Sequence, residues 1–219
     1  MVWPIRYHAP SVVLGLCLTL GGAGCTSDNN DNAVDQATLQ EVETALSSTV
    51  NNVTAAVNDV EARQAAAVVR QQVTTNQEPI NVPPVACLDS GELRVAGQVT
   101  VDDTSLALAA TLSFINCDGL NGAVAANVEG IRVVEADGVA LEYDATLNGA
   151  VTNDCSLTFD QVVVSASRSA VAGDTTGTID GAISATCGPV SLMCSLEALV
   201  FPQGPDTVTA ILANSCQRN

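Results

Sequence analysis

The residues that could do chemistry in this chain are limited by two absences. The 219-residue sequence contains no Lys, and its only His is His8. The rest of the chain therefore cannot build a Ser-His-Asp triad, a Cys-His pair, a Ser-Lys dyad, a Schiff base or a His-ligated metal site. Carboxylate chemistry needs two acids at a defined separation, and the sequence marks no such pair. It predicts no enzyme and no catalytic, metal-binding or cofactor-binding residue.

The acidic residues indicate a strongly negative protein surface and do not mark a particular site. There are 24 Asp and Glu residues against seven Arg, which gives a net charge of −17 at pH 7. So anionic a protein is repelled by nucleic acid and by anionic lipid surfaces. The composition therefore predicts no nucleic-acid partner.

The N-terminal segment has the features of an export signal. Arg6 lies in a short polar start, an apolar run extends from Ser11 to Leu20, and small residues follow before Cys25. This pattern predicts a signal peptide over residues 1–24 rather than a folded element. The run is also shorter than the roughly 18 apolar residues of a transmembrane helix. Residues 25–34, rich in Asn and Asp, are predicted to form a flexible tether.

The segment Gly22-Ala23-Gly24-Cys25 resembles the lipobox of bacterial lipoproteins, although Gly22 stands where that family usually has Leu. The resemblance implies that Cys25 is the lipidation site, is diacylated, and anchors the mature chain to a membrane of the bacterial cell envelope. Thr26 lacks the Asp that retains some lipoproteins at the inner membrane, so the resemblance slightly favours the outer membrane. Ordinary signal-peptidase cleavage after the small residues is the alternative.

The number of Cys residues agrees with lipidation of Cys25, because it leaves an even number for disulfides. Of eight Cys residues, Cys17 lies in the predicted signal peptide and Cys25 would carry the lipid. The remaining six are candidates for three disulfides in an oxidising compartment: Cys87, Cys117, Cys155, Cys187, Cys194 and Cys216. Zinc binding fits less well, because there is no Cys-x-x-Cys pair and no His beyond residue 8.

Residues 35–75 predict one long amphipathic helix. Apolar residues recur at spacings of three and four, at Leu39, Val42, Leu46, Val50, Val53, Val57 and Val60. Thr38 followed by Glu41 predicts a capping box at the helix start. The helix is expected to pack on its own sheet. Self-association through a coiled coil stays open, because positions 39, 46, 53 and 60 repeat every seven residues.

Residues 85–219 predict a disulfide-stabilised antiparallel β domain. Apolar and polar residues alternate over about eight segments, 93–101, 106–114, 122–134, 139–151, 157–166, 176–187, 192–201 and 207–213. Asp137-Gly138 is a strong hairpin signal. The segments 120–124 and 147–151 both read Leu-Asn-Gly-Ala-Val, and 179–183 reads Ile-Asp-Gly-Ala-Ile. In this repeat Gly permits the strand to coil or another stretch of backbone to approach it closely.

The predicted fold class is therefore mainly β (α+β), with a long N-terminal amphipathic helix followed by an antiparallel meander of about eight strands. Whether the meander is an open curved sheet or a barrel is left open.

Strand parity predicts how the cysteines pair. In an up-and-down meander alternate turns fall at the same end, which gathers all six Cys residues there. A disulfide needs Cα atoms within roughly 7 Å, a distance that neighbouring strands about 5 Å apart provide. Among 15 connectivities, pairing between adjacent strands predicts Cys87–Cys117, Cys155–Cys187 and Cys194–Cys216. A Cys87–Cys216 link would instead indicate a closed barrel.

Two function classes fit this organisation. The first is a lipid-anchored, non-enzymatic module of the cell envelope that serves binding or structural spacing. The alternative is a carrier of lipid or another apolar ligand in a cavity between helix and sheet, an analogy from fold alone. A carboxylate-based hydrolase comes third. An enclosed cavity would favour the carrier, and a filled core would favour the module.

Overall fold

The computed structural model describes residues 34–71, 78–80, 83–87, 90–136, 138–171 and 173–219. The predicted signal peptide, Cys25 and the tether up to residue 33 lie outside these residues. The described elements are α1 (Gln36–Gln71), β1 (Glu78–Pro79), β2 (Val85–Ala86), β3 (Glu92–Val101), β4 (Ser105–Cys117), β5 (Leu120–Glu135), β6 (Gly138–Thr152), β7 (Ser156–Arg168), β8 (Thr175–Cys187), β9 (Val190–Phe201), α2 (Pro205–Ser215) and β10 (Cys216–Arg218).

The strands form one antiparallel sheet, which confirms the mainly β prediction. Nine strands follow in the order β1-β3-β4-β5-β6-β7-β8-β9-β10, and β2 pairs with β3 beside this path. The central hairpin is the predicted one: β5 and β6 pair from Asn121 with Thr152 to Glu135 with Gly138. Strands β1 and β10 stand at opposite ends of the order and do not pair with each other. The described sheet is therefore open, not a closed barrel.

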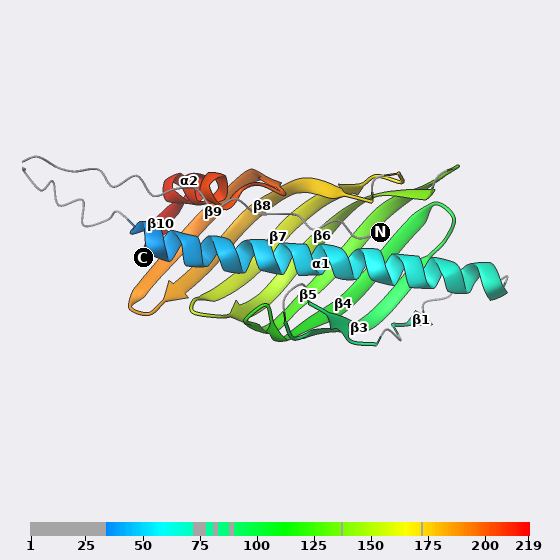
Figure 1. Cartoon of the computed structure of the whole chain (residues 1–219), viewed down its shortest axis with the longest axis horizontal. Coiled ribbons are helices and arrows are strands. Elements are labelled where there is room, and N and C mark those ends of the chain that lie inside the picture. The colour runs from blue at the N-terminus through cyan, green and yellow to red at the C-terminus, as the bar shows by residue number, and fades with distance from the viewer. Residues whose placement is uncertain (1–33, 72–77, 81–82, 88–89, 137, 172) are drawn as a thin grey trace, which may run out of the picture. The chain divides into compact units, whose positions relative to one another are not determined.

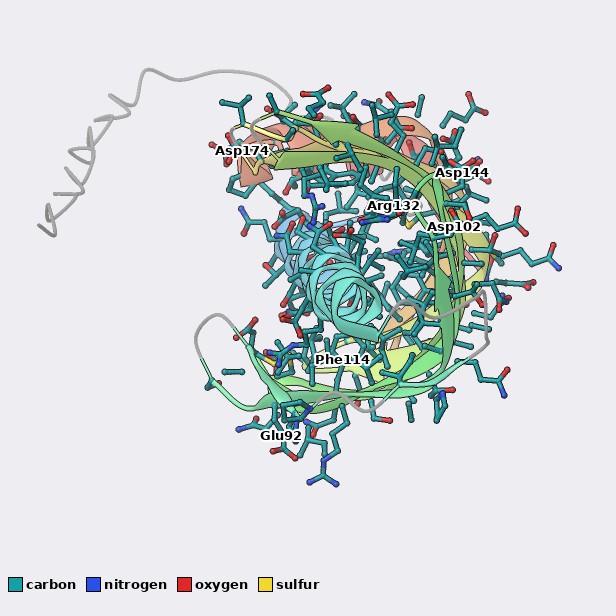
Figure 2. The ribbon with its side chains drawn as sticks, turned by 90° about the vertical axis from the view of Figure 1, so that its right-hand side faces the viewer. Glu92, Asp102, Phe114, Arg132, Asp144 and Asp174 are labelled. Carbon is teal, nitrogen blue, oxygen red and sulfur yellow. A yellow bond between two sulfur atoms is a disulfide. The ribbon has the colours of Figure 1, made fainter. Side chains whose placement is uncertain are left out.

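The sheet bends into a trough, and α1 lies along its concave face (Figure 1). Seen end-on, the strands wrap around the helix, with Phe114 and Arg132 on the inner side and Glu92 and Asp144 on the outer side (Figure 2). Because consecutive turns alternate between the two ends of the strands, the trough has two rims. We call the β4–β5, β6–β7 and β8–β9 turns the disulfide rim, and the β3–β4, β5–β6 and β7–β8 turns the clamp rim.

Helix α1 supplies much of the core. Nine of its apolar side chains are at most 3% exposed: Leu39, Val42, Ala45, Leu46, Val50, Val53, Ala56, Val57 and Val60. The start of α1 differs from the predicted capping box. Asp35 is the cap, because its carboxylate accepts hydrogen bonds from the backbone N–H and the hydroxyl of Thr38. These bonds hold the pKa of Asp35 below its usual value. Thr38 thus lies inside the first turn.

The short repeat accounts for much of the bending. Each copy places an Asn or Asp and then a Gly opposite a β-bulge on the neighbouring strand. The bulges contain residues with positive φ angles of 50°, 52° and 48°, namely Asn116, Gln161 and Ala198. A bulge leaves one residue unpaired and sharpens the local bend. The Asn or Asp side chain accepts a hydrogen bond from that residue's N–H, in the pairs Asn121–Asn116, Asn148–Gln161 and Asp180–Ala198, at 3.0, 2.9 and 2.7 Å.

The Gly residues of the repeat are required by backbone geometry. Gly122 and Gly149 have φ angles of +133° and +139°, a region that L side chains rarely adopt. A Cβ atom on Gly149 would lie 2.3 Å from the carbonyl oxygen of Ala123, and one on Gly122 would lie 2.3 Å from that of Ala150. The two Gly residues therefore permit β5 and β6 to approach closely where both strands bend.

The last predicted strand is wrong. Residues 207–213 lie in α2, which follows Gly204 and has Pro at its first turn. Pro with its fixed φ favours that position, and the buried Val208 and Leu212 have helical rather than alternating spacing. The edge partner of β9 is instead the three-residue β10, in which Cys216 lies directly opposite Cys194.

Candidate functional site

The six predicted cysteines form three disulfides in the predicted pairing. Cys87–Cys117, Cys155–Cys187 and Cys194–Cys216 have Cα separations of 5.4, 4.3 and 3.9 Å. Cys194 and Cys216 lie directly opposite each other on β9 and β10. Cys155 and Cys187 lie next to the Ser156–Thr186 pair at the end of the β7–β8 ladder, as the adjacent-strand argument requires. Together they fasten β2, β4, β7, β8, β9 and β10 at or near the disulfide rim.

A carboxylate of α1 meets one of these disulfides. The Glu41 Oε2 atom lies 3.3 Å from the Sγ atom of Cys155, and Glu41, Cys155 and Cys187 form a group with metal-ligand spacing. A thiolate is the species that binds metal, whereas both sulfur atoms here are joined to each other. In this oxidised form the cluster offers one carboxylate and no thiolate, so it does not make a metal centre.

The clamp rim holds α1 through buried charge. The Glu61 carboxylate lies 2.9 Å from Nε of Arg132 and 2.9 Å from Nη2 of Arg168, and the three side chains are 3%, 6% and 14% exposed. Arg132 also donates through Nη1 to the backbone carbonyl of Asp102 in the β3–β4 turn. One carboxylate thus serves two guanidinium groups from β5 and β7. We call these three residues the ion clamp.

Two neutral polar groups lie near the ion clamp. Tyr143 is 4% exposed and Thr54 is 7% exposed, so both hydroxyls are in the core. Burial raises the pKa of Tyr143 to about 12, although Thr54 and the positive charge of Arg168 each act to lower it. A phenol with this pKa stays protonated at neutral pH, so it is available only as a neutral hydrogen-bonding group.

Two further hydrogen bonds fasten α1 to the rims. Asn52 Nδ2 donates to Asp118 Oδ2 at 3.1 Å on the disulfide rim, and Asn58 Nδ2 donates to Thr175 Oγ1 at 3.1 Å on the clamp rim. Polar contacts therefore hold the helix at both sides of the trough.

The outer face of the sheet carries a broad hollow of about 840 Å³ across β4 to β8. Its exposed lining includes Glu129, Glu142 and Asp144, and no Arg lines it. Glu129 stands directly opposite Asp144 across β5 and β6, and Ser165 donates a hydrogen bond to Asp144 at 2.6 Å. Like charges at opposed positions repel each other. The tertiary structure thus brings together acids that the sequence did not mark as a pair.

A smaller recess lies on the inner side, between α1, the ends of β8 and β9, and the loop that leads into α2. It has a volume of about 80 Å³ and is lined by Glu43, Ser47 and Gln203 among apolar residues. Sequence reasoning missed both Glu43 and Glu61. Each lies four residues after an apolar position, Leu39 or Val57, so each is an acid on the apolar face of the helix. That placement was the available signal.

No family model matches the chain, and no curated protein or solved structure matches it either. No helix in the described part of the chain is both long and apolar enough to cross a membrane. Cys25 lies outside the described residues, so the anchor stays a prediction. Function is therefore inferred from the sequence and the geometry of this chain.

Proposed function

We propose that this protein is a lipid-anchored, non-enzymatic module of the bacterial cell envelope that serves binding or structural spacing. Cys25 would carry the lipid, and the outer membrane would be its destination. The observation that carries the proposal is the filled trough. The nine apolar side chains of α1 occupy the concave face, where a carrier would need its cavity.

The size of the inner recess also favours the module over the carrier. Sites for small-molecule ligands are typically about 300–1,000 Å³, whereas this recess has about 80 Å³. The ion clamp and the bonds from Asn52 and Asn58 further hold α1 in the trough. A carrier would have to break these contacts to admit an acyl chain.

The predicted helix over residues 35–75 belongs to this proposal as the filler of the trough. Its heptad positions 39, 46, 53 and 60 are buried within the same chain. Burial of this stripe supports an intrachain role for the helix over self-association, because a coiled coil would need the same residues at its seam.

The short tether would keep the module close to the membrane. Residues 26–34 separate Cys25 from the start of α1 and its cap. Nine residues span at most about 30 Å when fully extended. The folded part would therefore lie beside the bilayer, with its acidic surface in water.

The test is replacement of the anchor, Cys25→Ser, in the native host. The unchanged protein should fractionate with membranes after high-salt washing, and the Cys25→Ser protein should be soluble. A matched control is Cys17→Ser, which lies in the predicted signal and should leave fractionation unchanged. Membrane association of Cys25→Ser that survives salt would contradict the acyl anchor. Native mass spectrometry of the same preparations tests the carrier, which requires a co-purified apolar ligand.

A further inference from the structure

The recess beneath α1 has an apolar wall and a polar mouth. The wall comes from α1, β8, β9 and α2, with Leu46, Val50, Ile179, Leu199, Phe201 and Val208. Glu43, Ser47, Asn51 and Gln203 contribute the polar part of the lining. A mainly apolar concavity with a few convergent polar groups has the composition of a ligand site, although this one is small.

Glu43 is the unusual member of this lining. It is 7% exposed, and its carboxylate accepts hydrogen bonds from the hydroxyls of Ser47 at 2.8 Å and Thr44 at 3.4 Å. The ion pairs formed by described residues involve Asp59, Glu61 and Glu92, not Glu43. A buried carboxylate without a cation is costly, because hydroxyl donors compensate only part of the lost hydration.

Gln203 adds a second unsatisfied acceptor. Its Oε1 atom is buried and has no hydrogen-bond partner, and the residue lines the same recess as Glu43. A buried amide oxygen is normally bonded, so each exception calls for an explanation. The recess thus contains a carboxylate that has no cationic partner and an amide oxygen that has no hydrogen-bond donor.

We propose that this recess binds a small primary ammonium group. An ammonium supplies a positive charge and three N–H donors, which would serve the Glu43 carboxylate and the Gln203 amide oxygen together. The recess has a volume of about 80 Å³, well below the roughly 300 Å³ of ordinary small-molecule sites, so it suits a ligand of only a few heavy atoms. The ligand is therefore a short amine such as ethylammonium, with its carbons against Leu46 and Val50.

Amine binding at this recess would be a property beyond the proposed envelope role, and it would not depend on lipidation of Cys25. All the residues that line the recess are among those that the structure describes. For so small a ligand, the upper limit on binding energy per heavy atom means that binding is no tighter than about millimolar.

The experiment is a titration of the purified protein with ethylammonium chloride, followed by two-dimensional amide NMR. Three control solutes each lack one feature of ethylammonium. Sodium chloride at equal ionic strength lacks the apolar carbons, ethanol lacks the charge, and tetramethylammonium chloride lacks the N–H donors. We expect saturable shifts of the Asn51 and Gln203 side-chain amides with ethylammonium alone. Equal shifts with ethanol or tetramethylammonium would overturn the proposal.

The variants separate binding from folding. Glu43→Gln should weaken ethylammonium binding at least tenfold, and Gln203→Met should weaken it while keeping the charge. The matched control is Glu41→Gln, two positions away on α1 and outside the recess, which should bind as the unchanged protein does. If Glu43→Gln does not fold, Gln203→Met still decides the matter. Unchanged affinity in either folded variant would contradict the assignment.

Discussion

The two rims of the trough are held in different ways. The disulfide rim is fastened by covalent links, whereas the clamp rim holds α1 through Glu61, Arg132 and Arg168. The links of the first rim join residues 22 to 32 positions apart. The ion clamp joins residues 71 and 107 positions apart. The covalent links of one rim therefore join strands to one another, and the buried ion pairs of the other rim join the helix to the sheet.

This difference has a consequence for unfolding. A disulfide acts mainly by restricting the unfolded chain, so the disulfide rim should tolerate small changes of geometry. A buried ion cluster acts in the folded state, and its loss leaves charge without compensation. The clamp rim should therefore be the more sensitive to a single substitution.

The largest effect is expected from Glu61→Ala. The change leaves the buried Arg132 and the largely buried Arg168 without their carboxylate, so the free energy of unfolding should fall by about 3–5 kcal/mol. Urea denaturation followed by circular dichroism measures it. The control is Asp59→Ala, which removes the exposed pair with Arg63 and should cost about 0–1 kcal/mol. Similar losses in the two variants would mean that the ion clamp does not fix the helix.

A somewhat smaller effect is expected at the disulfide rim. Replacing Cys155 and Cys187 together by Ser opens a link between residues 32 positions apart and should lower the free energy of unfolding by about 3 kcal/mol. The measurement is urea denaturation without reductant, with the Cys194 and Cys216 double variant for comparison. If the loss were entropic, the second variant, with its separation of 22, should lose slightly less. A larger loss in the second variant would count against the loop-length explanation.

The smallest of the three effects is expected from Gly149→Ala. The φ of +139° and the approach to the Ala123 carbonyl predict a loss of about 1–3 kcal/mol from local strain. Gly173→Ala provides the control, because Gly173 has a φ of +70° and a Cβ atom placed there would meet nothing within 4 Å. Thermal melts of both variants separate the cost of the backbone angle from that of the clash. Equal melts would show that the close approach of β5 and β6 is unimportant for the bend.

The sequence was informative where structure depends on near neighbours. Alternation of apolar and polar residues predicted the antiparallel strands over 93–201, and strand parity predicted the three disulfides, because adjacent strands in a meander are also adjacent in the chain. The repeat around Gly122, Gly149 and Gly181 indicated that the backbones of neighbouring strands approach closely there, because Gly has no side chain to keep them apart. The error at residues 207–213 came from treating short apolar alternation as a strand although Pro205 favours a helix start.

What the sequence alone determined is thus the class of the sheet, the pairing of its cysteines and the Gly positions that permit close approach between strands. Only the tertiary structure decided that the sheet is open, that α1 fills it, and that Glu61 meets Arg132 and Arg168. It also decided that Glu43 and Gln203 share one recess. The contacts of Glu61 join residues 71 and 107 positions apart, and no local spacing rule encodes which distant side chains a bent sheet brings together.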